Sequence, residues 1–144
     1  ADSAEKLLPA NIELLNAKCW SRAVANRDLD VARAACDAAL TKGNWSAAHD
    51  SRGLVGLRQG RWSEAWEDYD DAVSSDPSLT LSLYGRGLAA LALGRTSEGE
   101  DDIAKASASA EEFMRLGLTP DSMRAEAPPL PDVPLPPPVT TAGN

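Results

Sequence analysis

The side chains best suited to chemistry are few. The chain contains two cysteines, Cys19 and Cys36, and one histidine, His49. They form no CxxC pair and no set with the spacing of a zinc site, so we expect no metal. The serines and the single histidine suggest no nucleophile and base, and the glycine-rich signatures of nucleotide binding are absent from the sequence. These observations predict a protein that is not an enzyme and uses no cofactor.

Charge and composition restrict the partners further. The 144 residues carry a net charge of -8, and their surface should therefore repel nucleic acid and anionic lipid. No apolar run approaches the roughly 20 residues of a membrane-spanning helix. Alanine and leucine dominate over β-branched and aromatic residues, a balance that favours helix. We therefore expect a helical protein whose partner is a protein or peptide, with neither nucleic acid binding nor membrane insertion.

The helices that must position these residues are indicated by an internal repeat. Two stretches match each other at an offset of 34 residues, and a weaker copy precedes them at an offset of 33, with Trp20 in place of Gly53. The matched pairs are Arg52 and Arg86, Gly53 and Gly87, Leu57 and Leu91, Gly60 and Gly94, Arg61 and Arg95, Ser63 and Ser97, Glu64 and Glu98, Asp68 and Asp102, and Ala72 and Ala106.

This period and its small residues resemble the tetratricopeptide repeat, a helix–turn–helix unit. Gly53 occupies a position where the two helices of a repeat cross closely, and Gly60 should turn the chain with a positive φ. The resemblance implies an all-α, right-handed superhelix of three repeats with a short capping helix. The expected helices span residues 11–25, 29–41, 45–59, 63–75, 78–93 and 97–107, with Ser63 and Ser97 as N-caps.

The repeat also divides the chain. Residues 1–10 form an N-terminal extension, and residues 11–118 form the repeat domain. Within that domain the repeats are 11–44, 45–77 and 78–110, and the cap is 111–118. Residues 119–144 form a proline-rich tail or linker, whose composition excludes helix from about residue 125 onward. The tail could be disordered, bind an aromatic groove of another protein, or occupy this protein's own groove or a neighbouring copy's.

Two arginines and two aspartates recur with the repeat. Asp68 follows Arg52 by 16 residues, and Asp102 follows Arg86 by the same interval. A ligand-binding arginine is one interpretation. We favour internal ion pairs, because a pair repeated with the unit follows from the geometry of the unit.

The two cysteines lie on different helices of the first repeat, at positions that face each other in the family's register. They are two buried thiols or a disulfide; we favour the disulfide, and with it a periplasmic or secreted protein, over a cytoplasmic one with reduced thiols. The motifs LNAKCW and SLYGRGLA also resemble repeat modules of alphaproteobacterial envelope proteins. Such modules often follow another domain, for example a protease, so this chain could be a fragment of a larger protein.

The resemblance implies that the first helix of each repeat lines a concave, apolar groove that binds a peptide or helix. Leu54 and Leu88 replace the asparagines of the family's clamp for a C-terminal carboxylate, which disfavours that ligand. We therefore predict a non-catalytic interaction scaffold; the alternatives are a structural or regulatory module of a larger enzyme and self-association through residues 125–144. The predicted groove residues are Lys18, Asp50, Leu54, Arg58, Leu81, Tyr84 and Leu88.

Overall fold

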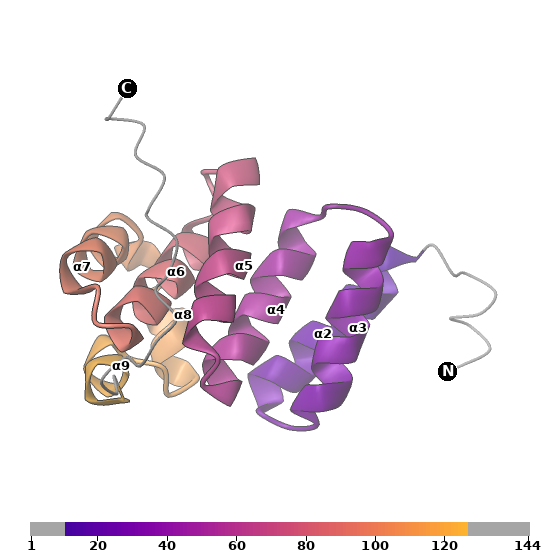
Figure 1. Ribbon diagram of the computed structural model, residues 1–144, viewed down its shortest axis with the longest axis horizontal. Coiled ribbons are helices and arrows are strands. Elements are labelled where there is room, and N and C mark those ends of the chain that lie inside the picture. The colour runs from indigo at the N-terminus through magenta and orange to yellow at the C-terminus, as the bar shows by residue number, and fades with distance from the viewer. Residues whose placement is uncertain (1–10, 127–144) are drawn as a thin grey trace.

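The computed structural model describes residues 11–126, and in this part of the chain every regular element is a helix (Figure 1). The helices run from the indigo N-terminal pair to the yellow C-terminal helix. They are α2 (Ile12–Ala25), α3 (Leu29–Thr41), α4 (Ser46–Gln59), α5 (Trp62–Ser75), α6 (Thr80–Ala92), α7 (Thr96–Lys105), the short 3-10 helix η1 (Ser107–Ser109), α8 (Ala110–Arg115) and α9 (Pro120–Glu126).

The helices pack as consecutive antiparallel pairs in two layers. α2 packs on α3, α4 on α5 and α6 on α7. The first helices also contact one another, α2 with α4 and α4 with α6, while α3 lies against α4 and α5 against α6. This arrangement confirms the predicted all-α helical repeat. We call the surface of α2, α4 and α6 the first-helix face.

Tight glycine turns set where the second helices begin. Gly60 has φ 73° and Gly94 has φ 80°, so both adopt the left-handed conformation expected of a glycine that ends a helix. The following residue closes each turn, since Arg61 N donates to Gly56 O and Arg95 N to Ala90 O.

The predicted N-caps Ser63 and Ser97 are therefore wrong. The helices start at Trp62 and Thr96, and the cap positions, Arg61 and Arg95, make no side-chain capping hydrogen bond. The turn has already fixed the direction of the chain before either serine is reached, so a serine side chain is not needed to start the helix.

The tightest packing in the core surrounds Tyr69 of α5. Its ring is 1% exposed and lies against two glycines, Gly53 of α4 and Gly85 of α6. A Cβ atom on Gly53 would lie 2.8 Å from the ring, and one on Gly85 would overlap it. Gly53 is thus retained for close packing, as predicted, and Gly85 plays the same part for the next helix. In the third repeat a Cβ on Gly87 would approach Gly99 O at 2.9 Å, so α6 and α7 also cross closely.

The C-terminal end of the domain differs from the prediction. The sequence placed a tail from residue 119, but Pro120–Glu126 form helix α9, which packs on α6. Thr119 and Ser122 cap this helix reciprocally, since each backbone N–H donates to the other's hydroxyl at 3.1 Å. Met123 then buries its side chain in the core. Residues 1–10 and the tail beyond Glu126 lie outside the described residues.

We expect the substitution Gly85→Ala to destabilise the protein by about 2–3 kcal/mol, because the new methyl group overlaps a fully buried ring that has no free space to move into. Urea unfolding measures the change. Gly43→Ala is the matched control, since its Cβ would meet no atom closer than Ile12 Cδ1 at 3.8 Å. Equal stability of the two variants would contradict the proposed role of the Tyr69 contact.

Candidate functional site

The predicted groove residues all lie on the first helices, but the structure divides them into covered and open positions. Leu54, Tyr84 and Leu88 are at most 1% exposed. In this structure the three side chains are therefore covered, and their contact with a partner stays a prediction. Lys18, Asp50 and Leu81 remain partly exposed.

The C-terminal helices cover part of the first-helix face. The Phe113 ring of α8 stacks on the Tyr84 ring of α6, with centroids 5.2 Å apart and planes inclined by 18°. Phe113 is 2% exposed, and Leu118 and Met123 join the same hydrophobic core. A single sequence could not show this covering, because the contacts join the third repeat to residues that lack the 34-residue period.

Arg58 is bound within the protein. The sequence placed its side chain at the edge of the groove, where it could contact a partner. In the structure its guanidinium donates to three backbone carbonyls: Nε to Ala23 O at 2.9 Å, Nη2 to Val24 O at 2.8 Å and Nη1 to Leu116 O at 2.8 Å. Burial lowers the pKa of Arg58 from its ordinary value. Arg58 therefore joins the end of α2 to the end of α8 through α4.

Asp50 is the acidic group of the partly open region. Its Oδ1 accepts a hydrogen bond of 2.8 Å from the Ser82 hydroxyl, which links α4 to α6. Burial raises the pKa of Asp50 to about 6, against the opposing effect of that hydrogen bond. A carboxyl group with this pKa changes charge near neutral pH.

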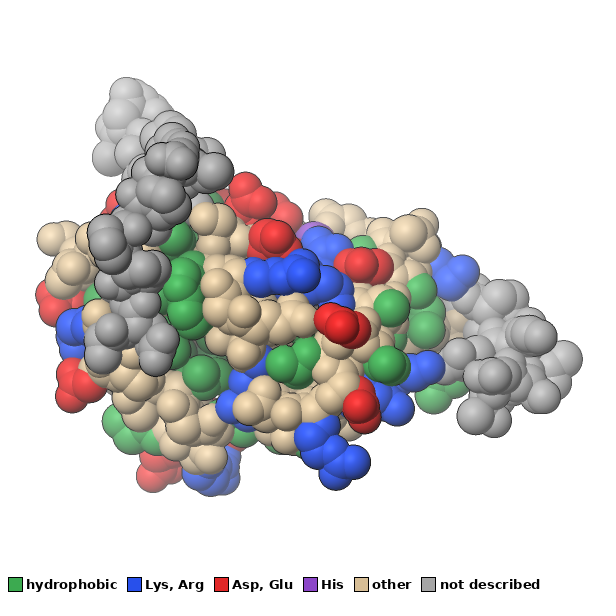
Figure 2. All heavy atoms as spheres, turned by 60° about the horizontal axis from the view of Figure 1, so that its bottom comes forward, with side chains coloured by type: hydrophobic (Ala, Val, Ile, Leu, Met, Phe, Trp, Pro, Cys, Tyr) green, Lys and Arg blue, Asp and Glu red, His purple; other side chains and the backbone are tan. Residues whose placement is uncertain are grey.

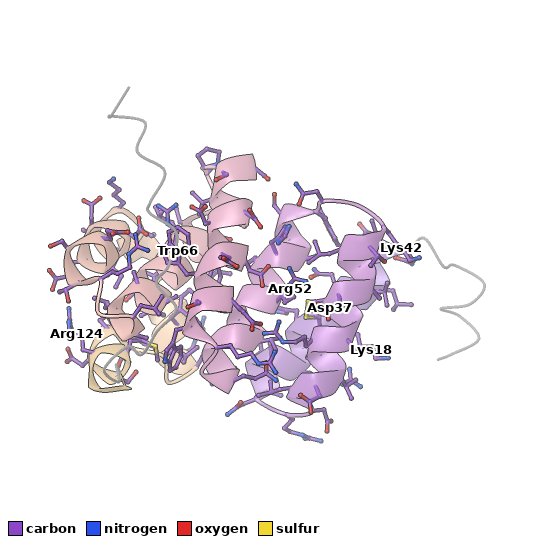
Figure 3. All side chains as sticks on the ribbon, viewed as in Figure 1. Lys18, Asp37, Lys42, Arg52, Trp66 and Arg124 are labelled. Atoms are coloured by element: carbon purple, nitrogen blue, oxygen red, sulfur yellow. A yellow bond between two sulfur atoms is a disulfide. The ribbon has the colours of Figure 1, made fainter. Side chains whose placement is uncertain are left out.

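The repeated arginines lie on the opposite side of the first helices, facing the second helices. Arg52 donates to both oxygens of Asp68. It also donates at 2.9 Å to Asp37 of the preceding repeat, and Figure 3 labels these two side chains. Arg86 does the same with Asp102 and Asp70, at 2.8 and 2.9 Å. The structure thus brings together both predicted pairs and adds a second aspartate to each. The hydrogen bonds to Asp68 and to Asp102 are the main causes that raise the pKa values of Arg52 and Arg86.

His49 belongs to the same network, and sequence reasoning missed it. Its Nδ1 lies 3.0 Å from Asp68 Oδ1 and its Nε2 lies 2.7 Å from Asn44 Oδ1. His49, Asp68 and Asp71 offer ligand atoms within 4.8 Å of one another, which is close enough for a metal ion. However, Asp68 already accepts hydrogen bonds from Arg52, and both ring nitrogens have partners. The network therefore satisfies itself internally and suits a metal ion poorly.

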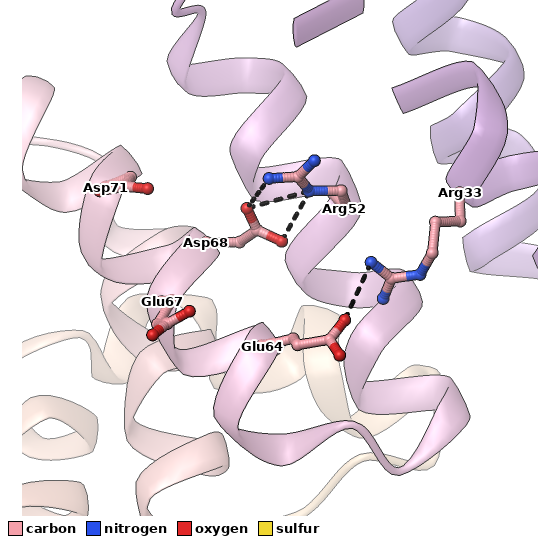
Figure 4. Close-up of a pocket in the computed structure, with 6 residues that line it drawn as sticks. All are labelled: Arg33, Arg52, Glu64, Glu67, Asp68 and Asp71. Atoms are coloured by element: carbon pink, nitrogen blue, oxygen red, sulfur yellow. Dashed lines mark hydrogen bonds and ion pairs between the residues drawn. The ribbon is translucent and has the colours of Figure 1, made fainter. Parts of the chain in front are cut away.

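A polar cavity of about 250 Å³ opens beside this network (Figure 4). Arg52 is paired with Asp68 and Arg33 with Glu64, while Glu67 and Asp71 line the wall without an ion pair to either arginine in the view. Its paired charges are those of a solvated junction between repeats, and they do not form a catalytic set of nucleophile, base and orienting group.

Cys19 and Cys36 form a disulfide that joins α2 to α3, with their Cα atoms 5.5 Å apart. Both side chains are fully buried. In the family's register Cys19 stands where Arg52 and Arg86 stand in the later repeats. The first repeat therefore holds its two helices together by a covalent bond at the place where the others use an ion pair.

We expect Asp50→Asn to stabilise the protein at pH 8 by about 1–2 kcal/mol, because it removes a carboxylate whose charged form is disfavoured by burial. The expected gain is smaller than the pKa shift would give for a fully buried carboxylate, because Asp50 is partly exposed and solvent screens its charge. The folded-state pKa of Asp50 is raised, so the stability that its protonation contributes is fully present below about pH 4 and is lost as the pH rises through 6. Asparagine stays neutral throughout, and the two proteins should become equally stable near pH 4.

Denaturant unfolding at a series of pH values tests this expectation. Asp101→Asn serves as the control, because that carboxylate is 63% exposed and pairs only with Lys105 at the surface. A stability difference for Asp50→Asn that does not change with pH would contradict the assignment.

Comparison with known proteins gives one partial match. Over 49 residues the chain is 45% identical to a protein of Fusarium oxysporum f. sp. lycopersici described as a "Tetratricopeptide repeat and J domain-containing co-chaperone DNJ1". The aligned part is 34% of this chain and 9% of that protein. No family model and no solved structure matches the chain. The match supports a tetratricopeptide repeat; it is to a fungal protein and lends nothing to the resemblance to alphaproteobacterial envelope modules.

Proposed function

We propose that this chain is a non-catalytic protein-interaction module that binds a peptide or helix on the open part of its first-helix face. The observation that carries the proposal is a strip of exposed residues on α2. Leu14 is 37% exposed, Ala17 and Ser21 are exposed, and Lys18 is partly exposed. Their spacing places them on one side of α2.

Several features favour a protein partner over nucleic acid or membrane. The net charge is -8, and positive and negative side chains are mixed on the face shown in Figure 2. A nucleic-acid surface would gather positive charge on one face. None of the described helices is long and apolar enough to cross a membrane. The partial relative is named as a co-chaperone, a description that fits a protein that works through other proteins.

A second candidate is a module that serves a larger protein. The relative's name joins tetratricopeptide repeats and a J domain, and the aligned part is 9% of that protein. This observation favours a repeat unit that acts beside another domain of the same polypeptide. Self-association through residues 125–144 is a third candidate, and residues 127–144 of that stretch lie outside the described residues.

The interaction proposal is tested with peptides selected from a displayed random library against the immobilised chain. We expect Leu14→Asp to weaken binding of a selected peptide by about tenfold or more, because it replaces the large apolar side chain of the strip with a charged one. Val31→Asp is the matched control: Val31 is 44% exposed but lies on α3, in the other layer. Failure to select any peptide, or a loss of binding confined to the Val31 variant, would show that the strip is not the binding surface.

We also propose that the protein works in an oxidising compartment, periplasmic or secreted, because its two cysteines form a buried disulfide and no free thiol remains. The alternative is a cytoplasmic protein with reduced thiols.

Alkylation of the unfolded protein, read by intact mass, should label neither cysteine before reduction and both after it. Reduction should also lower the free energy of unfolding by about 3 kcal/mol, since the bond closes a loop with a sequence separation of 17. A variant with Cys19→Ala and Cys36→Ala should not respond to reductant. If both thiols of protein isolated from its natural source are labelled without reductant, the cytoplasmic alternative becomes the better account.

A further inference from the structure

The segment from Ser107 to Glu126 occupies the α4–α6 half of the first-helix face. We propose that it acts as an intramolecular stand-in for the partner, and that a partner helix with the same apolar pattern displaces it. This inference rests on the proposed function. It adds the kind of partner that binds and the segment that controls access of the partner to the first-helix face.

The segment has one buried and one exposed side. Phe113, Leu118 and Met123 are between 2% and 7% exposed, and Leu116 packs against the same core. Met114, next to Phe113, is 53% exposed, and Glu112 and Arg115 pair with each other at the surface. This is the distribution of an amphipathic peptide that lies on an apolar surface through a few anchors.

The anchors contact the side chains that the sequence indicated for partner binding. Phe113 stacks on Tyr84, and the carbonyl of Leu116 accepts a hydrogen bond from Arg58. An incoming helix that ends at the same place would offer Arg58 the same kind of acceptor, since the last carbonyls of any helix lack partners within it. The segment thus occupies contacts on the α4–α6 half of the first-helix face that another helix could make.

The segment consists of short helices that depend on the repeat helices for their stability. α8 has six residues and α9 has seven, and Gly117 separates them with φ 78°. Helices of this length are not stable alone and depend on the surface that they cover. Apart from Arg58, its polar links to the repeat helices include Ser109 with Thr80 at 3.1 Å and an exposed pair of Arg124 with Glu100.

A hollow open to solvent borders the segment. It has a volume of about 430 Å³ and lies where Leu118, Ser122 and Met123 face Leu57, Arg58 and Trp62. The segment therefore does not fill the surface that lies beside it. A partner with a larger apolar side chain at this point would fill the space, and it could therefore compete with the segment even though the segment is tethered.

These features define the partner as a short amphipathic segment with a phenylalanine and, three residues later, a leucine at the end of a helix, followed by a second leucine after the helix has ended. Phe113, Leu116 and Leu118 have this arrangement around Gly117. Such a segment gains the aromatic contact and the hydrogen bond, and it can also fill the hollow beside Trp62.

A labelled synthetic peptide of residues 107–126 tests the inference against the full chain by fluorescence anisotropy. The Phe113→Ala chain, with its own segment weakened, should bind the peptide about tenfold more tightly than the unmodified chain, which competes through its tethered copy. Met114→Ala is the matched control and should behave as the unmodified chain, because Met114 is exposed. A peptide with alanine in place of phenylalanine should bind neither.

Equal binding to the Phe113→Ala and Met114→Ala chains would overturn the inference. Hydrogen exchange on the unmodified chain gives a second reading that needs no variant: amides of α8 and α9 should exchange through local opening, much faster than those of α4 and α6. Exchange of all four helices at one common rate would identify the segment as a fixed part of the core and would overturn the proposal. If the unmodified chain dimerises with rising concentration and the peptide abolishes the dimer, the occupant is a second copy, and the inference of a separate partner fails.

These outcomes are distinguishable from failure of the proposed function, because Leu14 lies on α2 and touches a different half of the face. If the segment is fixed but binding of a library peptide depends on Leu14, the proposed interaction function stands and only the proposal of a displaceable segment fails. Binding of the 107–126 peptide should accordingly be unchanged by Leu14→Asp.

Discussion

The position of the Tyr69 ring between two glycines is the constraint on which the rest of the structure depends. The ring is fully buried, and a methyl group at Gly53 or Gly85 would collide with it. The two glycines therefore set how closely α4 and α6 approach α5. That spacing in turn brings Ser82 of α6 within 2.8 Å of Asp50 of α4. The cost of glycine in a helix, about 1 kcal/mol each, is offset by the burial of a large aromatic side chain.

Charge is handled differently on the two sides of the first helices. Between the layers, Arg52 and Arg86 each bridge an aspartate of their own repeat and one of the preceding repeat, so each buried carboxylate has a charged partner. On the outer side, Arg58 satisfies carbonyls of the C-terminal end of α2, Ala23 and Val24, and the carbonyl of Leu116. Arginine side chains thus link neighbouring repeats between the layers, and on the outer side an arginine links α2 to the C-terminal helices.

The first-helix face consequently has two halves with different availability. The α2 side presents apolar and polar side chains to solvent. The α6 side is covered by an aromatic stack and by the two short C-terminal helices. In an interaction module of this design, the α2 side is accessible to a partner, whereas the α6 side becomes accessible only when the C-terminal segment moves away. The polar network around His49 lies away from both halves, between the layers.

The sequence by itself determined the helical repeat, the close crossing at Gly53, the positive φ of Gly60 and the pairing of each arginine with the aspartate 16 residues later, because a periodic pattern and a turn are local properties of the chain. It placed Cys19 and Cys36 opposite each other by register. Only the tertiary structure decided that Leu54, Tyr84 and Leu88 are buried and that Arg58 binds backbone carbonyls.

The physical reason is distance along the chain. The covering of Tyr84 and the bond from Arg58 to Leu116 depend on a segment up to 58 residues away that has no repeat partner. The residues Thr119, Pro120 and Ser122 form a local signal from which the start of α9 could have been predicted. The stability of α9, however, depends on burial of Met123 in the core, which no local pattern shows.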